Sequence, residues 1–145
     1  MKTNTSLAYD IPGKFEETRF EKNHNVIFDN SIVGSKAVAQ EMAELIRSKQ
    51  AKNKTCVLGL ATGSSPIKVY EELVRMHKED GLSFYNVISF NLDEYYPMEP
   101  DSINSYVRFM KELLFNHVDI LPENIHIPDG TLSKEAIGDY CAEYE

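Results

Sequence analysis

The stretch "CVLGLATGSSPIKVYEEL", residues 56–73, joins a tight apolar cluster to an amphipathic pattern through Thr-Gly-Ser-Ser-Pro. Its first six residues, 56–61, form a continuous apolar run, which is typical of a strand buried on both faces. From Pro66 onward the apolar residues recur at helical spacing, and Gly81 is the expected stop. The stretch therefore predicts a strand, a tight turn and a helix in direct succession.

The same alternation continues on both sides of this unit. Further strands are expected at 25–28, 87–91 and 124–127, and further helices from Ser31, over 106–114 and from Ser133. The helix from Ser31 has an expected apolar face made of Val38, Met42, Leu45 and Ile46. Strands that alternate with helices of this length indicate an α/β fold with a mostly parallel sheet, covered on both faces. Because the chain stops at Glu145 inside a helical pattern, a piece of a longer polypeptide is expected.

The composition is that of one globular domain of 145 residues. Residues 1–23 are polar and charged and predict an N-terminal extension, which leaves 24–145 for the domain. Fifteen basic against 23 acidic residues give a net charge of −8, which argues against nucleic acid or a membrane surface as the main partner. No run resembles a signal peptide or a membrane span, so a cytoplasmic protein is expected.

The turn at 62–66 admits two interpretations. Gly63 permits positive φ and a close approach of the backbone to an anion, and Ser64 and Ser65 supply hydroxyl groups. Ser65 followed by Pro66 is also a common way to cap a helix, with no ligand involved. The spacing matches neither a Walker A loop nor G-x-G-x-x-G, so nucleotide binding is not supported. From the turn alone, a helix cap and a phosphate cradle both remain open.

A second polar step follows the predicted strand 87–91, where Asp93 and Glu94 come next in "FNLDEYY". If the two strands are neighbours, Asp93 lies at the same sheet edge as the turn. Apolar flanking residues could raise the pKa of such a carboxylate and make it a general base. The alternative is that the acidic pair only solvates a loop or caps the next helix.

The cysteines and histidines indicate no further chemistry. Cys56 and Cys141 each lie in an apolar periodic segment and are expected to be reduced, packed thiols. The four histidines show no spacing typical of a metal site and no obvious nucleophile beside them.

Three stretches together resemble the N-terminal half of the glucosamine-6-phosphate deaminase family. They are "VLGLATGSSPIKVYEELVRMHKEDGLSF" at 57–84, "FNLDEYY" at 90–96 and "SYVRFMKELLFNHVDILPENIHIPDG" at 105–130. The resemblance implies a Rossmann-like α/β/α sandwich, with Gly63, Ser64 and Ser65 on the phosphate of an amino-sugar phosphate. It implies that Asp93 is the base of the isomerisation, with Thr62 and Glu94 as supporting residues. It also implies that no cofactor or metal is needed, and that a homo-oligomer of the longer polypeptide is possible.

The departures from the family pattern limit what this chain is expected to do. The turn reads Thr-Gly-Ser-Ser where the family has Thr-Gly-Gly-Thr or Thr-Gly-Ser-Thr, which keeps the hydroxyl. The later family motif that carries the ring-opening histidine does not occur before Glu145. We therefore expect little or no deaminase activity from these residues alone. The alternatives are a non-catalytic sugar-phosphate-binding or sensor module and, disfavoured by "FNLDEYY", a 6-phosphogluconolactonase.

Overall fold

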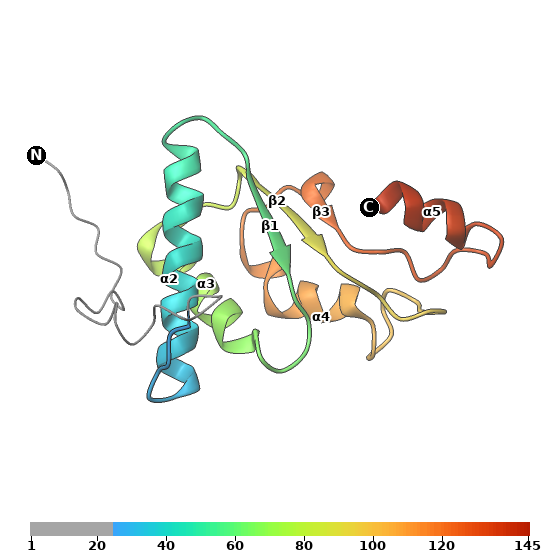
Figure 1. The fold of residues 1–145 in the computed structure, drawn as a ribbon. Helices are drawn as coiled ribbons and strands as arrows, with labels where there is room; N and C mark the ends of the chain where they lie inside the picture. Colours follow the sequence, from blue (N-terminus) through green and yellow to red (C-terminus); the bar gives the residue numbers. More distant parts are fainter. Residues whose placement is uncertain (1–24) are drawn as a thin grey trace, which may run out of the picture.

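The computed structural model describes residues 25–145, so the extension predicted at 1–23 lies outside the described residues (Figure 1). The longer elements are α2 (Ser31–Gln50), β1 (Cys56–Leu60), α3 (Ile67–Asp80), β2 (Val87–Asn91), α4 (Tyr106–Leu113), β3 (Ile125–His126) and α5 (Ile137–Tyr144). Two single 3₁₀ turns, η1 (Phe115–His117) and η2 (Pro122–Asn124), connect α4 to β3. The predicted alternation of strands and helices is confirmed from Ser31 onward.

The strands form one parallel sheet in the order β1-β2-β3. Cys56 pairs with Val87 and Leu60 with Asn91, so β1 and β2 run side by side over their full length. The third strand is short, and it pairs Ile125 with Ser89. The predicted α/β fold with a parallel sheet is therefore confirmed.

Helices α2, α3 and α4 lie on one side of the sheet, and α5 lies beyond β3 (Figure 1). The core between the three helices and the sheet is apolar and contains large, fully buried side chains: Ile46, Tyr70, Leu73, Leu82, Phe84, Val87, Met110 and Leu114. Burial of this much apolar surface is the main force that holds the helices on the sheet. Among the described residues, no helix combines the length and the apolar character needed to cross a bilayer.

Helix α2 begins where Asn30 Oδ1 accepts hydrogen bonds of 3.0 Å from the N–H groups of Ile32 and Val33. Its buried residues are Ala39, Ala43 and Ile46. The predicted apolar face was therefore partly wrong, since Val38 and Leu45 are each 44% exposed. The two alanines, at i and i+4, are small enough to let α2 pack closely on α3.

Three further expectations were wrong in detail. Residues 25–28 form no strand, and the last helix begins at Ile137 rather than at Ser133. Burial alternates along β1, where Val57 is 61% exposed between buried Cys56 and Leu58. The strands at 56–60 and 87–91 are thus covered on one face only within residues 25–145.

Candidate functional site

The turn after β1 takes the conformation that its glycine predicts. Gly63 has φ of +93°, in the region that side chains with a Cβ rarely adopt. Ser64 and Ser65 are exposed and Thr62 is half-buried. The predicted cap is displaced by one residue: Pro66 is the N-cap of α3, and it makes no side-chain cap because its ring has no hydrogen-bond acceptor. Ser65 is exposed and is not the N-cap residue of α3.

A tyrosine of α3 holds the start of this turn. The Tyr70 hydroxyl donates a hydrogen bond of 2.5 Å to the carbonyl of Ala61. Burial raises the pKa of Tyr70 to about 12, and the hydrogen bond to the Ala61 carbonyl lowers this pKa by a smaller amount. The turn is thus tied to the helix that follows it, a contact that the sequence pattern did not predict.

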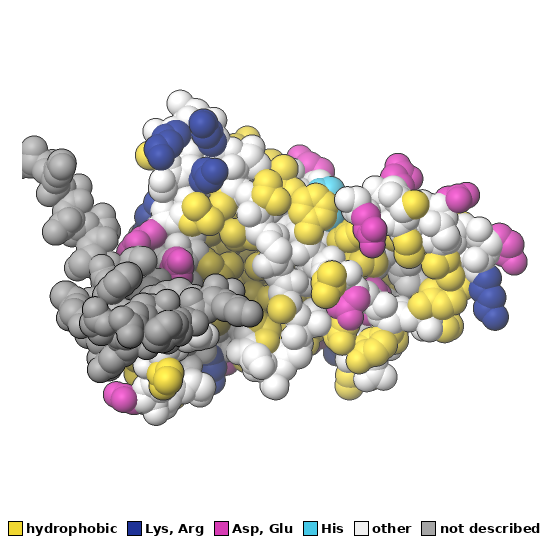
Figure 2. Space-filling model, in the orientation of Figure 1, with side chains coloured by type: hydrophobic (Ala, Val, Ile, Leu, Met, Phe, Trp, Pro, Cys, Tyr) yellow, Lys and Arg dark blue, Asp and Glu magenta, His cyan; other side chains and the backbone are white. Residues whose placement is uncertain are grey.

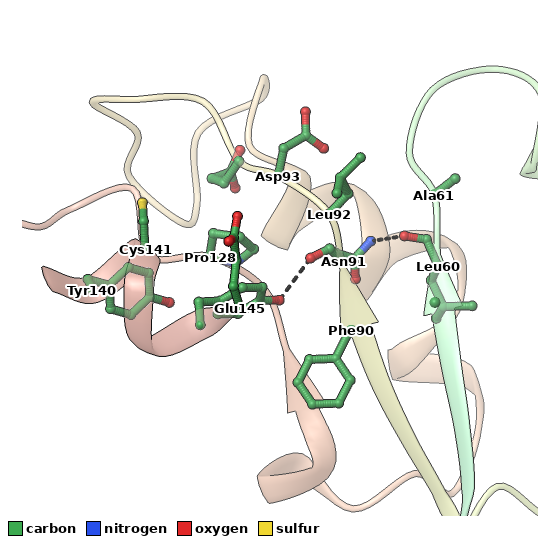
Figure 3. A pocket seen from close by; sticks show the side chains of 13 residues that line it. Leu60, Ala61, Phe90, Asn91, Leu92, Asp93, Pro128, Tyr140, Cys141 and Glu145 are labelled. Carbon is green, nitrogen blue, oxygen red and sulfur yellow. Dashed lines mark hydrogen bonds between the residues drawn. The ribbon is translucent and has the colours of Figure 1, made fainter. Parts of the chain in front are cut away.

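The carboxyl ends of β1 and β2 meet, as the prediction for Asp93 required. Leu60 and Asn91 are paired in the sheet, and Asn91 Nδ2 donates to the Leu60 carbonyl at 3.0 Å (Figure 3). Gly63 lies three residues beyond the end of β1, and Asp93 lies two residues beyond the end of β2. The turn and Asp93 therefore belong to the same edge of the sheet.

The surroundings of Asp93 differ from the expectation of a carboxylate packed among apolar groups. Asp93 is exposed, and its neighbours Leu92 and Tyr95 are exposed as well. Its side chain stands at the rim of a cavity beyond β2 (Figure 3). Within residues 25–145, Asp93 is a solvent-facing carboxylate at the mouth of a hollow.

Glu94 has a well-defined structural role at the start of α4. Its carboxylate accepts from the N–H groups of Tyr106 at 3.0 Å and Val107 at 3.1 Å, and from the Ser105 hydroxyl at 2.8 Å. Partial burial raises the pKa of Glu94, but these hydrogen bonds and one from Tyr95 N–H outweigh it and lower the pKa overall. Glu94 thus connects the loop that carries Asp93 to the N-terminus of a helix.

The cavity measures about 690 Å³, within the range of small-molecule sites. It lies between the ends of β1 and β2 and the helix α5, and its walls are mainly apolar. Its lining includes Leu60, Ala61, Phe90, Asn91, Asp93, Glu94, Pro128, Tyr140, Cys141, Tyr144 and Glu145. The predicted phosphate residues Gly63, Ser64 and Ser65 do not line it, so the structure brings Asp93 and Glu94, but not the turn, to this cavity.

One residue of α5 fixes the far wall of the cavity. The Tyr144 hydroxyl contacts the carbonyl of Asn91 at 2.8 Å and that of His126 at 3.1 Å, and it can donate to either. Burial raises the pKa of Tyr144, Tyr140 raises it further, and the hydrogen bond to Asn91 lowers it. The sequence predicted the helix that carries Tyr144 but gave no signal that its side chains would line a cavity.

The two cysteines differ in their surroundings. Cys56 is buried as predicted, but Cys141 is exposed at the rim of the cavity, so the expectation that both are packed was wrong. In the part of the chain that the structure describes, no three His, Cys, Asp or Glu side chains come together as metal ligands would.

Comparison with known proteins places this arrangement in a family. Residues 31–145 match the family model described as glucosamine-6-phosphate isomerases/6-phosphogluconolactonase. The whole chain is 51% identical to a glucosamine-6-phosphate deaminase-like protein of Bacteroides thetaiotaomicron, of which it covers 24%. Over 74% of the chain it is 50% identical to glucosamine-6-phosphate deaminase 2 of Giardia intestinalis, of which it covers 39%.

The fold agrees with these matches. A solved structure of a monomeric glucosamine-6-phosphate deaminase superposes with a TM-score of 0.75 at 35% identity, over 81% of this chain and 46% of that protein. The chain thus spans less than half the length of each of these three relatives. On the family model, the sequence identity and the fold, the chain belongs to the glucosamine-6-phosphate isomerase/6-phosphogluconolactonase family.

Proposed function

We propose that this chain supplies one wall of a sugar-phosphate site that acts on glucosamine 6-phosphate. In a protein that carries the whole fold, this site would convert glucosamine 6-phosphate and water to fructose 6-phosphate and ammonia. The observation that supports the proposal most directly is the pairing of Leu60 with Asn91, because it sets the Gly63 turn and Asp93 at one sheet edge.

Each residue has a distinct proposed task. The phosphate lies on the turn, where N–H groups at the start of α3 and the exposed hydroxyls of Ser64 and Ser65 can donate to its oxygens. The carboxylate of Asp93 takes the proton from C2 of the opened amino sugar and delivers it to C1. Glu94 holds the loop of Asp93 against α4 and has no part in the proton transfer.

Phosphate binding can be tested on this chain by NMR. Adding glucosamine 6-phosphate should shift the amide signals of Gly63, Ser64 and Ser65, and adding glucosamine without phosphate should not. Ser65→Ala should weaken binding about fivefold, the effect of about 1 kcal/mol from one lost hydrogen bond. Ser133→Ala, an exposed serine outside the site, is the matched control. If both sugars shift the same signals equally, the turn is not a phosphate site.

A non-catalytic binding or sensor role is the second candidate. The solvent exposure of Asp93 favours it, because a binding module has no need of a buried base. Ammonia release from glucosamine 6-phosphate separates the two candidates in a polypeptide with both halves of the fold. The deaminase proposal expects release that Asp93→Asn abolishes, whereas a sensor would bind the sugar and release none.

A further inference from the structure

The loop 92–104 joins β2 to α4 and carries Asp93. It lies at the surface, where Leu92 is 90% and Tyr95 54% exposed, and hydrophobic and acidic side chains stand over this part of the molecule (Figure 2). Within residues 25–145, no hydrogen bond or ion pair holds the Asp93 side chain itself. Because burial does not hold this part of the loop, the position of Asp93 depends on the contacts that the loop makes on either side of it.

One of these contacts is the cap that Glu94 forms on α4, and a second lies on the other side of the loop. There the loop meets residues 128–132, which connect β3 to α5 (Figure 1). Met98 N–H donates to the Gly130 carbonyl at 2.9 Å, and the Tyr96 hydroxyl donates to the Leu132 carbonyl at 3.0 Å. We call residues 128–132 the support segment, because the loop that carries Asp93 is bonded to it twice.

Gly130 lets the loop lie directly on the support segment. It is buried, and a Cβ added to it would stand 2.7 Å from the Tyr95 carbonyl oxygen and 2.8 Å from Met98 Cβ. Non-bonded carbon atoms pack at about 3.5–4.0 Å, so any side chain at this position would force the loop and the segment apart. Gly130 has no positive φ, unlike Gly63 and Gly81. A glycine is therefore needed here for space and not for backbone conformation.

The support segment is fixed by contacts of its own. Asp129 Oδ1 accepts from the N–H of Thr131 at 2.8 Å and from its hydroxyl at 2.7 Å, which closes a turn. Asp129 N–H donates to the Tyr140 hydroxyl of α5 at 3.0 Å. The segment is thus tied to α5 as well as to β3, whereas Tyr95 and Tyr96 of the loop are exposed. A side chain at position 130 would consequently displace the loop rather than the segment.

We propose that Gly130 is a positioning residue for Asp93, because its bare backbone sets where the loop, and with it the carboxylate, stands relative to the turn 62–66. The inference rests on the proposed function, in which Asp93 must reach C1 and C2 of a sugar whose phosphate lies on that turn. Displacement of a reacting group by about 1 Å can cost a factor of about 100 in rate. Gly130 has no contact with the turn, so phosphate binding should not depend on it.

NMR of this chain tests the geometric part of the proposal. Gly130→Ala should shift the amide signal of Asp93 and leave those of Gly63 and Ser65 in place. Titration with inorganic phosphate should give a Kd within about twofold of that of the unaltered chain. Gly138→Ala is the matched control, because a Cβ added to Gly138 would meet no atom within 4 Å, and it should leave the Asp93 signal unchanged. An unchanged Asp93 signal in folded Gly130→Ala would overturn the proposal.

Tyr96→Phe provides a second variant that does not threaten the fold. Tyr96 is 42% exposed, and the substitution removes only the hydroxyl that bonds to Leu132. It should shift the Asp93 amide signal by less than Gly130→Ala does. Tyr85→Phe, which removes an exposed hydroxyl outside the loop, should not shift it. If Gly130→Ala fails to fold, an unchanged Asp93 signal in Tyr96→Phe would overturn the proposal in its place.

The chemical part is tested in a polypeptide with both halves of the fold. Gly130→Ala should lower kcat for ammonia release from glucosamine 6-phosphate about 10- to 100-fold and leave KM within about twofold. Ile46→Val, which weakens the fully buried core away from the site, is the control for lost stability and should leave kcat unchanged. An unchanged kcat in Gly130→Ala, or an equal loss in Ile46→Val, would overturn the positioning role. An unaltered polypeptide that releases no ammonia would instead refute the proposed function, and the amide signal of Asp93 would still decide what Gly130 does.

Discussion

The hydroxyl of Ser105 donates a hydrogen bond of 2.8 Å to Glu94 Oε2, although eleven positions separate the two residues. Ser105 is itself the N-cap of α4 and accepts from the N–H groups of Val107 and Arg108. Glu94 accepts from Tyr106 and Val107 N–H beside it, so two side chains together serve the donors at the start of α4. The acidic pair after β2 thus divides into an exposed Asp93 and a helix-capping Glu94.

Glu94→Gln should lower the free energy of unfolding by about 1–2 kcal/mol, because the amide keeps the shape but loses charge and acceptor capacity. Glu112→Gln, on the helix that Glu94 caps, is the control. Glu112 is exposed and pairs with Arg108 at 2.7 Å, and its loss should cost less than about 0.5 kcal/mol. Urea unfolding at pH 7 measures both, and equal costs would contradict the capping role.

The same variant should change how stability depends on pH. The folded-state pKa of Glu94 lies below its usual value of 4.5, so its contribution is complete above about pH 4.5 and disappears as pH falls through the lower folded-state value. The difference in unfolding free energy between the unaltered chain and Glu94→Gln should therefore shrink on acidification from about pH 6 to about pH 3. A difference that stays constant over this range would show that the carboxylate charge is not involved.

Two glycine substitutions should have opposite effects on stability. Gly63 has φ of +93°, and a Cβ added there would meet no atom within 4 Å, so Gly63→Ala should destabilise by about 1–2 kcal/mol through backbone strain alone. Gly138 lies in α5 and has no positive φ, and a Cβ added there would also meet no atom within 4 Å. Gly138→Ala should stabilise by about 0.5–1 kcal/mol, since glycine weakens a helix relative to alanine. Thermal unfolding checks both signs, and destabilisation by Gly138→Ala would contradict the account.

Features of the fold that depend on local pattern could be predicted from the sequence. The strand, turn and helix of 56–81 lie where expected, Gly81 ends α3 with φ of +67°, and Gly63 has positive φ. These features depend on residues close together in the chain, so a short window contains the information. The pairing of β1 with β2 was only a condition of the sequence analysis, and the structure meets it, in keeping with the tendency of βαβ units to place successive strands side by side.

Features that depend on distant partners could not be predicted. The role of Glu94 requires Ser105 and α4, and the lining of the cavity requires α5 to return to the end of β2. The buried face of α2 includes Ala39 and Ala43, whose small size suits close contact with α3. The hydrophobicity pattern of the sequence does not show that contact. An apolar run also does not reveal which of its residues are covered, so the exposure of Val57 could not be predicted.

Tyr70→Phe should loosen the turn before α3 with little effect on the core. It removes the hydrogen bond to the Ala61 carbonyl but keeps the buried ring, so the unfolding free energy should fall by about 1 kcal/mol. Amide exchange at Gly63 and Ser65 should become faster. Tyr85→Phe, which removes an exposed hydroxyl, should leave both quantities unchanged. Unaltered exchange at the turn in Tyr70→Phe would show that Tyr70 does not hold it.

Asn91→Asp should be the most destabilising of these changes, because it reverses the polarity of a buried contact. Asn91 is 2% exposed, its Nδ2 donates to the Leu60 carbonyl at 3.0 Å, and its Oδ1 has no partner in the described residues. A carboxylate would set two acceptors against each other, at a cost of about 2–3 kcal/mol or more. The exposed Asn104→Asp is the control and should change stability by less than about 0.5 kcal/mol.

The stability of Asn91→Asp should also depend on pH. Because a protonated carboxyl can donate to the Leu60 carbonyl again, the pKa of the new group should be raised in the folded chain. The loss of unfolding free energy should therefore be smaller at about pH 4 than at about pH 8. Urea unfolding at the two pH values measures this, and an equal deficit at both would show that the hydrogen bond between the strand ends does not account for the loss.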